Sequence, residues 1–408
     1  MKPWPVVLAG LVALGVAMGI GRFAFTPLLP MMLADGVVDL AGASWLASAN
    51  YAGYLLGALL CTFQPWLWRR LGAARPLHGP TLVRAGLAGT VLLTLGMALQ
   101  APALWPALRF AAGLASAMVF IYTSGWCLAR LGELQVPALG ALIYVGPGAG
   151  IVLSGLAASA MVALQGSAGL GWLVFGLLAA LLTALVWPIF SGAGRAAFPA
   201  GAPATGPAEI RVPGPRLELA LLALAYGLAG FGYIITATFL PVIARTALPG
   251  SPWLDLFWPL FGAGVIIGAL VASRVRSGGD LRLALGGCYA VQAAGIGVGL
   301  ASPSLWGFAL GSLLLGLPFT AITFFAMQEV RRIRPAQAAS FMGLLTALYG
   351  IGQIAGPPLA AALLARSGTS GQGFRLSLQL AMAALLLGVV LYGVLARTFP
   401  MRTARPAP

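Results

Sequence analysis

Long apolar stretches alternate with short polar or basic ones along almost the whole chain. A helix needs about 20 apolar residues to cross the hydrocarbon core of a bilayer. Dividing the chain at the polar stretches predicts twelve such helices. They cover residues 5–33, 42–67, 80–100, 103–128, 136–163, 168–190, 217–246, 253–274, 281–301, 304–329, 336–366 and 374–397. We therefore expect an all-α, polytopic membrane protein.

One connection is much longer than the others. Residues 191–216 are rich in Gly, Ala and Pro and have few large apolar side chains to bury. Such a composition is typical of a flexible linker. It divides the chain into an N-terminal half of six helices, residues 1–190, and a C-terminal half of six helices, residues 217–408.

The two halves resemble each other in sequence. A constant shift of 211 residues (264 − 53) places Gly53-Tyr54-Leu55-Leu56-Gly57 on Gly264-Val265-Ile266-Ile267-Gly268 and Pro30 on Pro241. The same shift places Gly21-Arg22 on Gly232-Tyr233. An internal repeat of this kind predicts a substrate site at the interface of the halves, near the bilayer midplane.

Composition supports a membrane protein and excludes a soluble one. The chain is 60% hydrophobic and only 8% charged, whereas a soluble domain carries about 25% charged residues. The net charge of +15 could suggest nucleic-acid binding, but the basic residues are scattered between apolar stretches rather than gathered in one stripe. Most of them lie in one alternate set of loops and at the termini, so both termini are expected in the cytoplasm.

Few residues are suited to metal binding or catalysis. Cys61, Cys127 and Cys288 have no paired spacing, so we expect neither a disulfide framework nor a metal site. The single histidine, His78, lies in a basic loop. One histidine and dispersed carboxylates argue against an enzyme, and no cofactor is expected.

Arg22 lies in the middle of the first apolar stretch. An arginine at the centre of a membrane helix costs about 2.5–3.5 kcal/mol on insertion scales. All eight acidic residues lie in loops or near the ends of spans. Because guanidinium groups bind carboxylate and phosphate, we interpret Arg22 as the anchor of a small organic anion. The alternative is structural pairing with helix-end carbonyls, or with Asp35 or Glu329 brought near by folding.

Helical spacing predicts which polar side chains surround Arg22. The alternative for each of them is an interhelical hydrogen bond, worth about 0.6 kcal/mol on average. The predicted substrate-binding set is Arg22, Thr26, Asn50, Tyr54, Ser116, Tyr122, Tyr144, Tyr233, Thr236, Thr320, Thr323, Tyr349 and Gln353.

Three motifs add candidates for coupling or gating. Arg109-x-x-x-Gly113 lies in the fourth span, and its alternative is an interfacial arginine that extends outward. Gly146-Pro147-Gly148 lies in the fifth span, where Gly permits close helix crossing and Pro can kink a helix. Arg69-Arg70-Leu71-Gly72 follows the second span.

These motifs and the twelve predicted spans resemble the major facilitator superfamily. The fourth-span arginine is similar to that of proton-linked members, and the Gly-Pro motif is similar to that of drug/proton antiporters. The Arg70 and Gly72 loop is similar to the superfamily's loop motif, except that Arg69 occupies its acidic position. Simple topology-setting charge is the alternative for this loop.

Two further segments resemble the YbfB/YjiJ-type branch of the superfamily. They are the runs from Gly19 to Pro30 and from Leu46 to Gly57. The resemblance implies a monomeric secondary transporter of a bacterial cytoplasmic membrane that works by alternating access. We expect its substrate to be a small anionic or amphipathic molecule, with efflux and proton coupling left open. The alternative is a membrane sensor of the same fold that does not transport.

Overall fold

The computed structural model describes residues 2–70, 78–99, 101–191, 216–251, 253–275, 280–333 and 338–400. Gly72 and nearly all of the predicted linker 191–216 lie outside the described residues.

The N-terminal helices are α1 (Pro3–Leu14), η1 (Gly15–Arg22), α2 (Phe25–Ala34), α3 (Leu40–Arg70), α4 (Gly79–Gly96), η2 (Pro102–Leu104), α5 (Trp105–Glu133), η3 (Pro137–Tyr144), α6 (Val145–Ala163), α7 (Ala168–Val186) and η4 (Ile189–Ser191). The C-terminal helices are α8 (Arg216–Ala247), η5 (Leu254–Leu256), α9 (Phe257–Ala272), α10 (Leu281–Ala301), α11 (Leu305–Gly316), α12 (Phe319–Ile333), α13 (Ala338–Arg366) and α14 (Ser370–Thr398).

The predicted all-α, multi-pass architecture is confirmed. Within the described residues, 11 helical stretches are long and apolar enough to cross a membrane. The helix outside this set is α4, which has 18 residues and carries Arg84. The predicted span 304–329 consists of two helices, α11 and α12, which are separated at Leu317 and Pro318.

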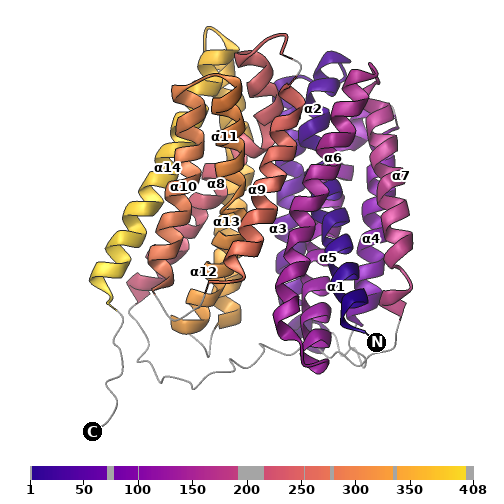
Figure 1. Cartoon of the computed structure of the whole chain (residues 1–408), viewed down its shortest axis with the longest axis vertical. Helices are drawn as coiled ribbons and strands as arrows, with labels where there is room; N and C mark the ends of the chain where they lie inside the picture. Colours follow the sequence, from indigo (N-terminus) through magenta and orange to yellow (C-terminus); the bar gives the residue numbers. More distant parts are fainter. Residues whose placement is uncertain are drawn as a thin grey trace.

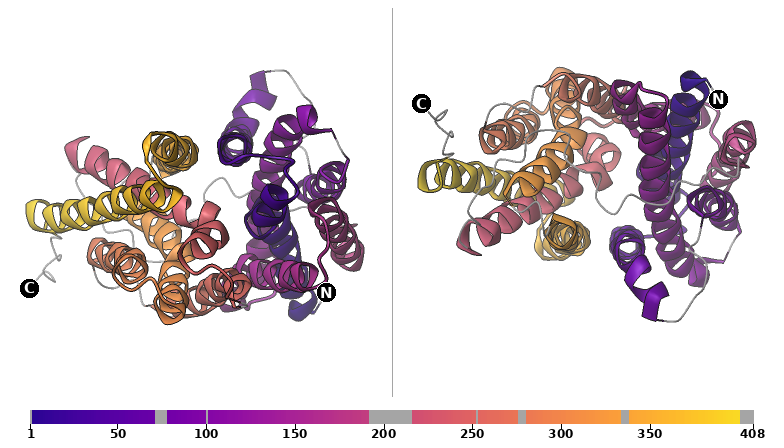
Figure 2. Two further views of the ribbon diagram at one scale, coloured as in Figure 1. Left: turned by 90° about the horizontal axis from the view of Figure 1, so that it is seen from above. Right: turned by 90° about the horizontal axis from the view of Figure 1, so that it is seen from below.

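The helices form two groups that lie side by side. Helices α1 to α7 make one group and α8 to α14 the other (Figure 1). In both end-on views the two groups occupy opposite sides of the molecule (Figure 2). The largest contacts between the groups join α3 with α13, α6 with α9 and α2 with α8, and the short helices η5 and η3 also contact α6 and α9, respectively. Helix α1 begins and α14 ends at the same end of the molecule, which we call the terminal end (Figure 1).

The first span is not one continuous α-helix. Its middle part, η1, is a π-helix that ends at Arg22. Gly19 of η1 packs against α6 so closely that a Cβ atom there would lie 2.3 Å from Gly150 Cα. Gly15 likewise faces Gly146. Single π-helical turns occur frequently at functional sites. The π-helix therefore supports a functional role for Arg22 at its end.

The Gly-Pro motif lies where η3 passes into α6. Pro147 is in the first turn of α6, where proline is tolerated, and the predicted span 136–163 changes from a 3₁₀-helix to an α-helix just before it. Gly146 and Gly150 face the first span, whereas a Cβ atom on Gly148 would lie 2.8 Å from the carbonyl oxygen of Gly262 in α9. One motif therefore packs against both groups of helices.

Glycines related by the shift of 211 residues make equivalent contacts. A Cβ atom on Gly53 would lie 1.8 Å from the carbonyl oxygen of Phe110 in α5, and one on Gly264 would lie 2.5 Å from that of Leu313 in α11. The shift also relates Thr26 to Ala237. The hydroxyl of Thr26 donates a hydrogen bond of 2.8 Å to the carbonyl oxygen of Ala237, so α2 and α8 meet at corresponding positions.

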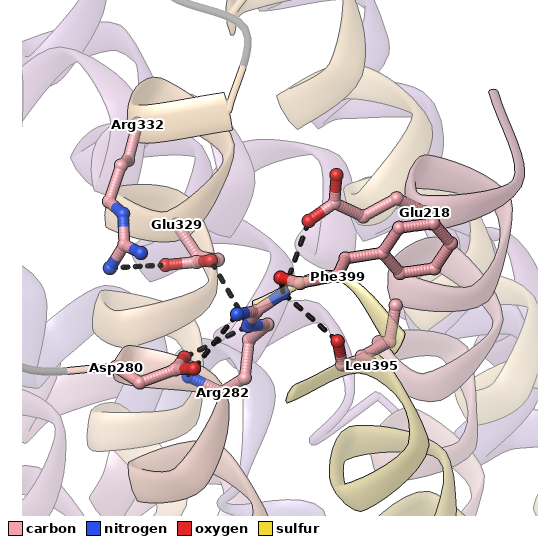
Figure 3. A network of polar contacts seen from close by, with 7 residues as sticks. All are labelled: Glu218, Asp280, Arg282, Glu329, Arg332, Leu395 and Phe399. Atoms are coloured by element: carbon pink, nitrogen blue, oxygen red, sulfur yellow. Dashed lines mark hydrogen bonds and ion pairs between the residues drawn. The ribbon is translucent and has the colours of Figure 1, made fainter. Parts of the chain in front are cut away.

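A buried network of charges joins four C-terminal helices at the terminal end (Figure 3). The guanidinium of Arg282 lies at its centre, with Nη1 3.2 Å from Glu218 Oε1, Nη2 2.8 Å from Asp280 Oδ2 and Nε 3.7 Å from Glu329 Oε1. Nη1 also donates to the carbonyl oxygens of Leu395 and Phe399 at the end of α14. The network therefore fixes the ends of α8, α10, α12 and α14 to one another.

Candidate functional site

Arg22 lies between the two groups of helices and is almost completely buried, with 3% of its surface exposed. Its Nη2 donates a hydrogen bond of 2.7 Å to Oε1 of Gln353 in α13. Its guanidinium carbon lies 3.8 Å from the centre of the Tyr54 ring. The Nε atom is buried and has no hydrogen-bond partner. The guanidinium is thus held by one amide oxygen and by cation–π contact.

No ion pair within the described residues involves Arg22. The two carboxylates named as alternative partners lie elsewhere. Asp35 accepts a hydrogen bond from the backbone nitrogen of Ala168, and Glu329 belongs to the Arg282 network. In this conformation a buried cation therefore has polar and aromatic neighbours but no counter-ion.

A series of tyrosines continues from Gln353 into the C-terminal group. The amide nitrogen of Gln353 donates to the hydroxyl oxygen of Tyr233. The ring of Tyr233 stacks on that of Tyr349, with centres 5.9 Å apart and planes at 26°. Tyr349 in turn lies 4.9 Å from Tyr226, whose hydroxyl donates to Thr323 at 3.1 Å. The contacts link α8, α12 and α13 to Arg22.

We call the residues around Arg22 the Arg22 cluster. Its members are Arg22, Tyr51, Tyr54, Tyr226, Tyr233, Tyr349 and Gln353. Five of these seven were predicted from the sequence.

The structure shows two tyrosines that the sequence reasoning missed. Tyr226 lies seven residues, or two helical turns, before Tyr233, and this spacing could have placed both on one face of α8. Tyr51 faces Arg22 at 5.5 Å and shares a hydrogen bond of 2.9 Å with Thr238. Tyr51 follows Asn50 directly, and neighbouring residues in a helix point in different directions. Choosing the face of α3 that carries Asn50 therefore left Tyr51 out of the prediction.

Arg109 is buried rather than extended towards the helix end, so the interpretation as an outward-reaching arginine is wrong. Its Nη1 and Nη2 donate to the carbonyl oxygens of Gly21 and Arg22, at 3.4 and 3.2 Å. These carbonyls lie where η1 ends. Asn50 donates to the carbonyl oxygen of Arg109 at 2.9 Å. Arg109 and Asn50 therefore support the backbone that carries Arg22, rather than lying beside its guanidinium.

Several predicted residues lie outside the Arg22 cluster. Thr26 binds the Ala237 carbonyl, and Ser116 donates to the carbonyl oxygens of Ala17 and Ala112. Thr236 lines a small pocket between α8, α10, α11 and α14. The remaining four are Tyr122, which is buried in α5, Tyr144, whose ring packs on that of Phe120, Thr320, which is half-buried in α12, and Thr323, which accepts the hydrogen bond from Tyr226.

The described residues predicted to act in coupling or gating also lie outside the Arg22 cluster. Gly146 and Gly148 make the close helix contacts described above, with Pro147 between them. Arg70 is exposed at the end of α3, and Gly72 lies outside the described residues.

Solved structures of transporters share this fold. The nucleoside transporter NupG superposes with a TM-score of 0.66 at 14% sequence identity, covering 98% of this chain and 100% of that one. A bacterial homologue of the human lysosomal transporter Spinster, in an inward-facing and unoccupied conformation, gives a TM-score of 0.69 at 12% identity, covering 98% of both chains. At these identities the likeness shows the fold alone.

The paired helix groups give the chain the fold of these transporters. Residues 14–393 match the family described as uncharacterised MFS-type transporter YbfB, so the chain belongs to this family of the major facilitator superfamily (MFS). It is therefore not an enzyme, as predicted. A chloramphenicol resistance protein from Streptomyces lividans is 28% identical over 412 residues, covering 95% of this chain and 94% of that protein.

Proposed function

We propose that this MFS-type transporter moves a small organic anion across the cytoplasmic membrane and binds its acid group at Arg22. The two halves, residues 1–190 and 217–408, rock about the Arg22 cluster and expose it to one side of the membrane at a time. The excess of basic residues in one set of loops supports a cytoplasmic terminal end.

One observation supports an anionic substrate. The Arg22 guanidinium is buried, has no ion pair within the described residues, and leaves Nε without a partner. A buried charge without a counter-ion costs several kcal/mol in real proteins. A substrate carboxylate would supply both the missing charge and the missing acceptor, since guanidinium and carboxylate form two parallel hydrogen bonds.

The direction of transport and its energy source are separate parts of the proposal. The relative from Streptomyces lividans is named for chloramphenicol resistance, which supports export. Proton coupling would use a titratable group outside the Arg22 cluster, because arginine stays protonated. The buried carboxylates among the described residues, Glu218 and Glu329, lie in the Arg282 network.

Flux into proteoliposomes tests the proposal. Candidate organic acids are offered to the unmodified protein and to the Arg22→Ala variant. We expect the variant to fold and to lose at least 90% of saturable uptake, because it lacks the only charged donor of the cluster. The matched control is Arg84→Gln, which removes a partly exposed arginine of α4 that contacts Trp187 at the end of α7.

Two outcomes would contradict the proposal. Normal flux in Arg22→Ala would exclude Arg22 as the anchor. Saturable binding of an organic acid without any flux would instead support a membrane sensor of the same fold.

A further inference from the structure

The Arg22 guanidinium leaves one edge for a substrate. The ring of Tyr54 covers one of its faces at 3.8 Å. Carboxylates approach guanidinium groups at the edge, within the plane, and bind two nitrogens at once. On the edge formed by Nε and Nη2, Nε has no partner and Nη2 donates to the amide oxygen of Gln353. This edge accepts a carboxylate when the Gln353 side chain turns away.

Several tyrosine rings lie around Arg22 and its partner Gln353. Tyr51, Tyr226 and Tyr233 are buried, whereas Tyr54 from α3 and Tyr349 from α13 are partly exposed. Tyr349 is kept in place by ring contacts with Tyr226 and Tyr233. The hydroxyls of these two neighbours are held by Thr323 and Gln353. Each half therefore contributes one partly exposed tyrosine ring to the Arg22 cluster, and the Tyr349 ring is held by its neighbours.

The charged residues near the Arg22 cluster also limit which charges the substrate can have. Arg22 and Arg109 are the buried cations here, since Arg109 donates to the carbonyl oxygens of Gly21 and Arg22. The described carboxylates all have partners elsewhere: Asp35, Asp39, Glu133, Glu218, Asp255, Asp280 and Glu329. An ammonium group on the substrate would therefore find two cations nearby and no counter-ion, which disfavours amino acids and other zwitterions.

We infer that the substrate is a planar aromatic carboxylate without an amino group. Its carboxylate binds the Nε and Nη2 edge of Arg22, and its ring packs against Tyr349 or Tyr54. This inference rests on the proposed function, since it assumes that Arg22 binds the acid group. Contact between aromatic rings should make such an acid bind about three- to tenfold more tightly than a saturated acid of the same size and charge.

Calorimetric titration of the purified, full-length protein tests the inference with four probes. Benzoate is compared with cyclohexanecarboxylate, which lacks the aromatic ring, with benzamide, which lacks the charge, and with phenylalanine, which adds an ammonium group. We expect benzoate to bind most tightly, cyclohexanecarboxylate to bind three- to tenfold more weakly, and the other two not to bind. Arg22→Ala should bind none of them.

Two variants of Tyr349 isolate the contribution of the ring. Tyr349→Phe keeps the ring and should keep the preference for benzoate, whereas Tyr349→Leu should bind both acids with similar affinity. If Tyr349→Leu does not fold, Tyr54→Leu provides the same comparison from the other half.

The results separate this inference from the proposed function. Equal affinity for benzoate and cyclohexanecarboxylate, with both lost in Arg22→Ala, would overturn the aromatic preference and leave an anion site at Arg22. Binding of phenylalanine as tight as that of benzoate would overturn the exclusion of zwitterions. If no carboxylate binds, or if Arg22→Ala binds them unchanged, both proposals fail.

Discussion

Gln353 is the residue whose replacement best tests the role of Arg22. Its amide oxygen lies 2.7 Å from Nη2 of Arg22 and connects the two groups of helices. The proposed substrate carboxylate must displace this oxygen. Gln353 therefore competes with the substrate, and its affinity for Arg22 sets how easily the site opens.

The variant Gln353→Glu should lose transport. A carboxylate at this position would form a permanent ion pair with Arg22, and charged hydrogen bonds are roughly twice as strong as neutral ones. We expect flux in proteoliposomes to fall at least tenfold while the melting temperature rises or stays the same. The control Gln353→Met keeps the size and removes the acceptor, and it should still bind the acid. Unchanged flux in Gln353→Glu would show that the substrate does not compete for this edge.

Among the elements, α6 has the most informative pair of positions. A Cβ atom on Gly150 would lie 2.4 Å from the carbonyl oxygen of Gly15, within the N-terminal group. A Cβ atom on Gly148 would lie 2.8 Å from that of Gly262, in the C-terminal group. Both positions exclude alanine in this conformation, but only the second contact changes when the two halves move apart.

The variants Gly150→Ala and Gly148→Ala should therefore differ. We expect Gly150→Ala to lower the melting temperature by several degrees, because overpacking a well-packed contact costs about 1–3 kcal/mol. Gly148→Ala should change the melting temperature less and slow transport more, since it disfavours only conformations in which α6 and α9 touch. Thermal unfolding and flux are measured on the same preparations. Equal effects of the two variants would contradict a moving contact at Gly148.

Hydropathy could predict the spans but not their breaks. A stretch of about 20 apolar residues is long enough to cross the bilayer as a helix, so length and composition are enough to locate the helices in the sequence. The π-helix at η1 instead depends on backbone contact between Gly19 and Gly150, which are far apart in the chain. The division between α11 and α12 also depends on local backbone geometry near Pro318.

At the scale of the whole molecule, the Arg282 network stabilises the terminal end of the C-terminal group. Removing one partner of a buried ion pair leaves an uncompensated charge and typically costs about 3–5 kcal/mol. Arg282→Gln should therefore lower the free energy of unfolding by about that amount, measured by denaturant unfolding in detergent. Arg274→Gln, at the exposed end of α9, is the control. A loss below about 1 kcal/mol would show that the network contributes little.

The same network predicts how stability depends on pH. Burial raises the pKa of Asp280, but hydrogen bonds from Arg282 and its positive charge lower that pKa more, so the net shift is downward. A carboxylate with a lowered pKa stabilises the fold above its unfolded value of about 3.9, and this stabilisation is lost as the pH falls through the folded value. The unmodified protein should lose stability on acidification below about pH 4, and Arg282→Gln should lose less.

The composition of the Arg22 cluster could be predicted only in part. Arg22 could be predicted as a site residue, because an arginine inside a membrane span is costly and suggests a functional role. Tyr54, Tyr233, Tyr349 and Gln353 followed from helical spacing. Thr236 was placed on the wrong face of α8. Residues 232–244 of this helix are buried on every side, so the rotation of this part cannot be read from the positions of its polar residues. The sequence also gave no sign that Asn50 and Arg109 support the backbone.

The hydrogen bond from Thr26 to Ala237 joins two positions that the internal repeat makes equivalent. In a duplicated gene, most residues of one copy can drift without regard to their counterparts in the other. These two positions are in direct contact, through the hydroxyl of Thr26 and the backbone of Ala237. Sequences of relatives should therefore show paired substitutions at 26 and 237, with a small side chain kept on at least one of them, long after the rest of the two copies has diverged.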